Sequence, residues 1–169
     1  FFWDEEKGAY IDSFTSGKRN VTRHANIFAI LFDIADKQKQ EKILTNVLEN
    51  DEIPAITTPY FNFFELDVLC QMGKLTEVLD KIRSYWGGML DLGAVTFWEE
   101  YDPSVPKEEQ YDMYGDHFGK SLCHAWAASP IYFLAKYFAG LDLVNKDGVT
   151  YVLKPQMQYF TDLDCTLPV

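Results

Sequence analysis

Residues 25–32 read Ala-Asn-Ile-Phe-Ala-Ile-Leu-Phe, and this stretch decides the class of fold. It forms the middle of a segment, residues 21–36, that has apolar side chains on nearly every side of a helix. A helix of that kind is normally buried on most of its surface. Thr22 is suited to be its N-cap. The sequence therefore predicts a buried inner helix at this point.

The later segments alternate between this buried character and an amphipathic one. Residues 39–50 carry a single apolar stripe, and residues 60–72 are apolar on most faces and should stop at Gly73. Residues 74–86 are amphipathic again, and a long loop is expected over residues 87–120. Residues 121–141 predict another apolar helix, which Pro130 either kinks or begins. Helical hairpins stacked in a ring produce this alternation, because their outer helices face water. We expect an all-α fold that is part of such a ring.

Both ends of the chain predict short extended pieces. Residues 4–12 contain a turn at Gly8 followed by an extended stretch, and residues 149–153 predict a strand, with an extended tail after it. About five helices would leave the apolar faces of the inner helices open. We therefore expect either that more chain completes the ring or that the chain self-associates.

The composition excludes several classes of partner. The net charge is -11 over 169 residues, so a phosphate backbone would be repelled and nucleic acid is not expected as a partner. No apolar run is long enough to span a membrane. The start of the chain does not resemble a signal peptide, and it is typical of a cut inside a longer protein. Three scattered cysteines predict small buried thiols in a reducing compartment such as the cytoplasm, with the periplasm and secretion as open alternatives. The cysteines and histidines have no metal-ligand spacing, so no cofactor or metal is expected.

Chemistry is expected where loops meet the N-terminal ends of the inner helices. Three polar clusters fall there, and the sequence from Trp98 to Glu100 with His124 is the most informative. Aromatic rings stack on sugars, and carboxylates do acid–base work on them. A surface acidic loop with a packed tryptophan would give the same pattern. The other clusters are Arg23, His24 and Asn26, and Thr57, Thr58 and Tyr60.

The stretch Leu-Gly-Ala-Val-Thr-Phe-Trp-Glu, residues 92–99, and the later Ser-Leu-Cys-His, residues 121–124, resemble glycoside hydrolase family 78, the bacterial and fungal α-L-rhamnosidases. His-Ala-Asn at residues 24–26 and Thr-Pro-Tyr at residues 58–60 are similar to the same family. The likeness covers roughly residues 3–155 and is strongest over residues 89–129. Val95 and Cys123 depart from the family, which often has Thr and Asn at these positions.

The resemblance implies an inverting hydrolase on a six-hairpin (α/α) barrel, or toroid. In the family pattern Glu99 is the general base and His124 lines the rhamnose pocket. Glu99 and Glu100 are not expected to be the acid–base pair, because adjacent carboxylates cannot readily flank one sugar ring. The resemblance implies that the general acid lies in an earlier hairpin, upstream of Phe1. Residues 1–145 would be part of the catalytic barrel, and residues 146–169 would begin a truncated C-terminal β-sandwich.

The sequence thus predicts hydrolysis of terminal α-L-rhamnosides, with a carbohydrate as the partner and with little activity of this chain alone. Glu99 is the expected catalytic residue. The expected substrate-binding residues are His124, Trp98, Glu100, Tyr60 and Asn26. Two alternatives stay open. One is a barrel protein that binds carbohydrate without turnover, and the other is a related barrel hydrolase or lyase that acts on another sugar.

Overall fold

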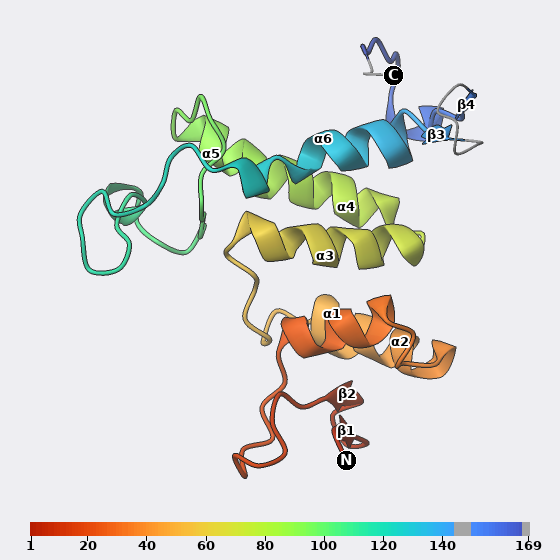
Figure 1. Cartoon of the computed structure of the whole chain (residues 1–169), viewed down its shortest axis with the longest axis vertical. Coiled ribbons are helices and arrows are strands. Elements are labelled where there is room, and N and C mark those ends of the chain that lie inside the picture. Colours follow the sequence, from red (N-terminus) through yellow and green to blue (C-terminus); the bar gives the residue numbers. More distant parts are fainter. Residues whose placement is uncertain (144–149, 167–169) are drawn as a thin grey trace. The chain divides into compact units, whose positions relative to one another are not determined.

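A computed structural model describes residues 1–143 and 150–166. The described chain is mostly helical, with a few short strands, as Figure 1 shows. This confirms the mainly α class. No barrel is detected in the described part of the chain, so the toroid stays a prediction. The chain divides into two compact units, Phe1–Val68 and Leu69–Val169, each of which is described by itself.

The first unit begins with a β-hairpin that confirms the predicted turn and extended piece. Strand β1 (Trp3–Asp4) pairs antiparallel with β2 (Ala9–Tyr10), and Gly8 takes a φ of 58° at the bend. The buried carboxylate of Asp4 accepts the backbone N–H groups of Glu6 and Lys7. It also accepts the Arg19 Nε–H at 2.7 Å, and this bond is the main cause that holds the pKa of Asp4 below its usual value.

Three helices follow in the first unit, close to their predicted positions. They are α1 (Arg23–Leu31), α2 (Lys37–Ile43), which continues as a π-helical stretch (Leu44–Leu48), and α3 (Pro59–Gln71), which runs into the second unit. Helix α1 ends earlier than predicted because Asp33 leaves the helical region with a φ of 55°. Thr22 is at the N-cap position, but its hydroxyl donates to Asp12 instead of capping the helix.

Arg23 joins the three helices of this unit from a buried position. Its guanidinium donates to the carbonyl oxygens of Leu48 at 2.8 Å and Asn50 at 3.3 Å. Leu48 is the last residue of the π-helical stretch that continues α2, and Asn50 lies just after it. The same group lies 3.1 Å from the Glu65 carboxylate on α3, and both side chains are almost fully buried. Arg23 was expected to lie at the opening of a binding site, but its guanidinium instead holds the three helices of this unit together.

Replacement of Arg23 by alanine should lower the free energy of unfolding by about 3–5 kcal/mol, because a buried carboxylate loses its cation and two carbonyl groups lose a donor. Denaturant unfolding followed by circular dichroism measures this. Arg83→Ala is the matched control, since Arg83 is exposed and its ion pair with Asp80 spans 4.0 Å. That variant should change stability by no more than about 0.5 kcal/mol. Equal effects of the two variants would contradict the role of Arg23.

In the second unit, α4 (Leu75–Lys81), a π-helical stretch (Ile82–Trp86) and α5 (Gly87–Asp91) follow without a break. The prediction that a loop begins at residue 87 was wrong. Gly87 keeps a helical φ of -61°, and the chain leaves the helix near Gly93, which has a φ of 93°. The predicted stop at Gly73, before α4, is confirmed by its φ of 74°.

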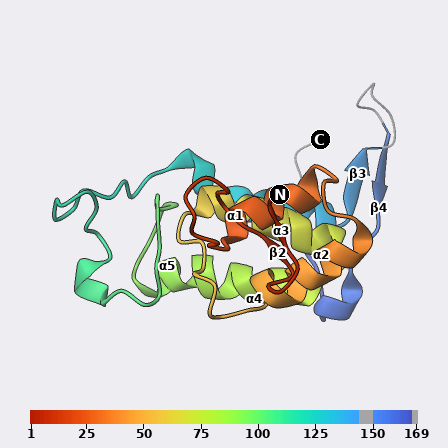
Figure 2. The same cartoon turned by 90° about the horizontal axis from the view of Figure 1, so that it is seen from below.

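A long irregular segment, residues 92–128, leads from α5 to α6, as Figures 1 and 2 show. It contains only two short 3-10 turns, Lys107–Glu109 and Ala125–Ala127. Helix α6 (Ser129–Phe133) continues as a π-helical stretch (Leu134–Phe138). The predicted helix over residues 121–141 was therefore too long, and Pro130 marks its true beginning in the first turn.

Beyond α6, strand β3 (Leu141–Leu143) pairs antiparallel with β4 (Tyr151–Leu153), and a 3-10 turn follows (Met157–Tyr159). The strand expected at residues 149–153 is confirmed for its described part, while residue 149 lies outside the described residues. Pairing of β3 was not foreseen. The division into a barrel and a β-sandwich stays a prediction.

Two further expectations concern the environment of the chain. None of the helices in the described ranges is long and apolar enough to cross a membrane. The expectation of three buried thiols was correct only for Cys70, because Cys123 and Cys165 are exposed. Both exposed cysteines lie in irregular segments of the second unit.

Candidate functional site

Two parts of the long segment pair with each other and form the candidate site. The backbone N–H of Glu99 donates to the carbonyl of Ser121 at 2.9 Å, and the N–H of His124 donates to the carbonyl of Phe97 at 2.8 Å. The Thr96 hydroxyl donates to the carbonyl of Leu122. The two stretches that carry the family resemblance are therefore adjacent, although about 25 residues separate them in sequence.

The Glu99 carboxylate is held by one of its oxygens. Its Oε2 accepts the Ser121 N–H at 3.1 Å and lies 3.9 Å from His124 Nδ1. Within the described residues, Oε1 has no hydrogen-bond partner, and the side chain is 14% exposed. One oxygen thus fixes the orientation of the group, and the other remains able to contact water or a ligand.

The two tryptophans of this region have different surroundings. Trp98, an expected sugar platform, is only 3% exposed and packs edge-on against Tyr111 with ring centroids 5.5 Å apart. Trp126 is 46% exposed, and its ring lies 4.1 Å from the His124 ring at an angle of 36°. Sequence reasoning missed Trp126, although it lies two residues after His124 in the segment that leads to α6.

Aromatic side chains attach the long segment to the helical run from α4 to α5. Trp86 is buried, and its Nε1–H donates to the carbonyl of Ala127 at 2.8 Å. The Tyr101 ring packs edge-on against Tyr85 at 5.5 Å and lies directly over Gly88. A Cβ at Gly88 would come within 2.7 Å of a ring carbon of Tyr101. The close approach of the segment to α5 thus depends on this glycine.

Replacement of Gly88 by alanine should displace Tyr101 and lower the free energy of unfolding by about 1–3 kcal/mol, because the added methyl group overlaps a buried ring. Gly87→Ala is the matched control, since nothing lies within 4 Å of a Cβ at Gly87. That variant should be neutral or stabilise by up to about 1 kcal/mol. Thermal unfolding of both variants measures the difference, and a Gly88→Ala protein as stable as Gly87→Ala would refute the packing argument.

Glu100, the other expected carboxylate, faces a buried amine. Its Oε2 lies 3.9 Å from the Nζ of Lys120, whose residue is 7% exposed. Burial lowers the pKa of Lys120, and the neighbouring carboxylates, with Glu100 the strongest, partly oppose this. Sequence reasoning missed Lys120, because a buried lysine and a solvated one look alike in a loop sequence.

The two remaining predicted residues, Asn26 and Tyr60, belong to the first unit, whereas Glu99 belongs to the second. Asn26 is fully buried, and its amide accepts the Tyr10 N–H and donates to the carbonyls of Tyr10 and Thr22. Two of these bonds join Tyr10 of the β-hairpin to α1, and the third is made to Thr22 at the start of the same helix. Tyr60 is 43% exposed and packs edge-on against neighbouring phenylalanines of α3.

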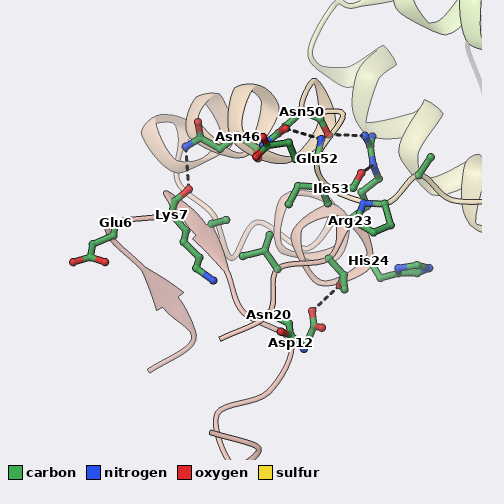
Figure 3. A pocket seen from close by; sticks show the side chains of 15 residues that line it. Glu6, Lys7, Asp12, Asn20, Arg23, His24, Asn46, Asn50, Glu52 and Ile53 are labelled. Carbon is green, nitrogen blue, oxygen red and sulfur yellow. Dashed lines mark hydrogen bonds between the residues drawn. The ribbon is translucent and has the colours of Figure 1, made fainter. Parts of the chain in front are cut away.

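A separate hollow of about 750 Å³ lies in the first unit, between the β-hairpin, the start of α1 and the residues after α2. Figure 3 shows its polar lining, with a hydrogen bond from Thr22 to Asp12 and another from Asn46 to the Lys7 carbonyl. Arg23 borders it, but its guanidinium is committed to Glu65 and to backbone carbonyls. The Arg23 guanidinium is therefore not available to a ligand in this hollow.

Neither comparison with known proteins gives a relative. No model of a known protein family matches the chain, and no curated protein matches it. In the described ranges, no group of three or more His, Cys, Asp or Glu side chains is arranged to hold a metal ion. The chemistry of the candidate site therefore depends on Glu99 and the groups around it.

Proposed function

We propose that the chain supplies the general base and part of the sugar pocket of an inverting α-L-rhamnosidase-type glycoside hydrolase, built on an (α/α) barrel. One observation carries the proposal. The Oε2 of Glu99 accepts the Ser121 N–H and lies 3.9 Å from His124 Nδ1. Its Oε1 has no hydrogen-bond partner among the described residues. These are the residues that the resemblance pairs as base and pocket lining.

In the proposed reaction, Glu99 takes a proton from a water molecule as the oxygen of that water attacks the anomeric carbon. The glycosidic bond breaks at the same carbon, and a general acid protonates the departing oxygen. The acid and base of inverting enzymes lie about 6.5–9.5 Å apart on opposite sides of the sugar. Glu100 follows Glu99 directly and faces Lys120, so we assign the acid to another part of the full-length protein.

Sugar recognition falls to His124 and to Trp126. The imidazole of His124 is 27% exposed and can bond sugar hydroxyls, while the exposed Trp126 ring can stack on the C–H face of a pyranose. A neutral sugar is also compatible with a chain of net charge -11. Trp98, by contrast, contributes to the packing of the loop.

Glu99→Gln in the full-length protein should lower kcat for an aryl α-L-rhamnoside by roughly a thousandfold or more, because an amide cannot accept the proton of the attacking water. The release of nitrophenol measures this. Glu108→Gln is the matched control, because Glu108 is an exposed acid of the same segment and should leave the rate unchanged. The wild-type product should first emerge as the inverted anomer, which ¹H NMR detects.

Other outcomes of that assay would redirect the assignment. Nearly full activity of Glu99→Gln would make Glu99 a bystander and Glu100 the next candidate. Activity on a different aryl glycoside, with none on the rhamnoside, would favour a related barrel enzyme for another sugar. Inactivity on every glycoside would favour the alternative of a carbohydrate-binding protein without turnover.

Trp126→Ala should raise KM by roughly three- to tenfold with little change in kcat, because a stacking ring contributes about 0.5–1.5 kcal/mol to binding. Trp126→Phe keeps an aromatic face and should recover most of the loss. Initial-rate kinetics on the aryl rhamnoside separate the two parameters. If alanine and phenylalanine behave alike, or if only kcat changes, Trp126 does not form a sugar platform.

A further inference from the structure

The hollow of the first unit is a cavity that the proposed reaction does not use. Its volume of about 750 Å³ is within the range of small-molecule sites in proteins, about 300–1,000 Å³. All of the residues that line it belong to Phe1–Val68, and none of them belongs to the candidate site around Glu99. Figure 3 shows polar side chains around it from the β-hairpin, from the stretch before α1, and from the π-helical stretch after α2 with the residues that follow.

Hydrogen bonds and close packing hold the walls of the hollow in place. The Asn46 amide donates to the Lys7 carbonyl at 3.1 Å, and a Cβ at Gly8 would lie 2.5 Å from the same amide nitrogen. In the stretch before α1, the N–H of Asp12 donates to the carbonyl of Asn20 at 2.9 Å. A cavity whose walls are already fixed loses little conformational freedom when a ligand binds, and this favours binding.

Several polar side chains of the lining keep hydrogen-bonding capacity. Within the described residues, the amide of Asn20 and the carboxylate of Glu52 form no hydrogen bond and no ion pair. Asp12 accepts a hydroxyl through Oδ1 at 2.7 Å, so its Oδ2 can accept a further donor. The Lys7 ammonium donates to the Arg19 carbonyl, which leaves two of its three N–H groups. The hollow thus offers both donors and acceptors to a ligand.

The charges around the hollow disfavour an anionic ligand. Its two cations already have partners, because Lys7 donates to a carbonyl and Arg23 to a carboxylate and two carbonyls. Three acids of the lining form no ion pair in the part of the chain that the structure describes, and these are Glu6, Asp12 and Glu52. Their carboxylates would repel a phosphate or a carboxylate ligand.

We propose that this hollow binds a neutral saccharide. Each sugar hydroxyl both donates and accepts hydrogen bonds, which matches the mixture of free donors and acceptors. The C–H face of a sugar ring needs apolar contacts, and the lining supplies them from Val21, Ile53, Pro54 and Ala55. A ligand without net charge also avoids the repulsion that an anion would meet. The inference goes beyond the proposed reaction, because it concerns binding by the first unit and holds whether or not Glu99 is a base.

The test measures binding by saturation-transfer NMR on full-length protein that carries Glu99→Gln and Trp126→Ala. These two substitutions remove the proposed base and the proposed stacking ring, so binding that remains comes from elsewhere. The neutral probes are the methyl glycosides of L-rhamnose, D-glucose, D-galactose and D-mannose, and methyl β-D-glucuronoside is the anionic counterpart. We expect saturable binding of at least one neutral glycoside at up to about 50 mM. The glucuronoside should have a dissociation constant about tenfold higher or more.

Two substitutions locate the bound sugar. Asn20→Ala removes a free amide without breaking a side-chain bond, and it should raise the dissociation constant by about three- to tenfold. Ala55→Trp places a large ring in the hollow from an exposed position, and it should abolish binding. Gln38 is an exposed residue of α2 outside the lining. The matched controls Gln38→Ala and Gln38→Trp should therefore bind as before, and circular dichroism checks that every variant is folded.

The outcomes separate this inference from the proposed function. Absence of binding for all four neutral glycosides overturns the inference, and so does binding that Asn20→Ala and Ala55→Trp leave unchanged. A glucuronoside that binds as tightly as the neutral glycosides contradicts the argument from charge. Binding of methyl β-D-glucosaminide, a cation, without any neutral glycoside would make the hollow a cation site instead. None of these results bears on the proposed reaction, which the rate of Glu99→Gln tests separately.

Discussion

The pairing of residues 96–99 with residues 121–124 is the constraint on which the candidate site depends. Without it, Glu99 and His124 would be far apart in a segment with almost no regular secondary structure. A few backbone bonds, each contributing about 0.5–1.5 kcal/mol, set the register. This register brings the Ser121 N–H within hydrogen-bond distance of the Glu99 carboxylate, and that bond orients the side chain.

Both units attach irregular backbone to helices by the same physical means. In the second unit a buried indole, that of Trp86, donates to a carbonyl just before α6. In the first, the guanidinium of Arg23 donates to carbonyls just after α2. Carbonyls outside helices need donors when they are buried, and a long side chain from a neighbouring helix supplies them. Binding loops can then be irregular while their supports are rigid.

The sequence predicted the helices well and the loop chemistry only in part. Periodicity located helices α1 to α4. Pro130 was expected either to kink the last helix or to begin it, and it lies in the first turn of α6. The prediction that the helix ends at residue 87 was wrong, because it was based on the glycine-rich composition that follows. Gly87 has a helical φ and no steric conflict, so the helix continues through it. The proximity of Glu99 and His124 was expected from the placement of loops at one end of the predicted ring, and also from the resemblance. Lys120 and Asn26 are buried and Trp126 is exposed, and neither periodicity nor residue type reveals this for single polar or aromatic positions.

The central claim is that Glu99 and His124 belong to one sugar site. A crystal structure of the full-length protein with bound L-rhamnose tests it most directly. The account predicts that the sugar lies over the Trp126 ring, with hydroxyls bonded to His124 and a water or the anomeric hydroxyl within hydrogen-bond distance of Glu99 Oε1. Rhamnose bound elsewhere, with Glu99 facing only solvent and the pairing of the two segments intact, would contradict it.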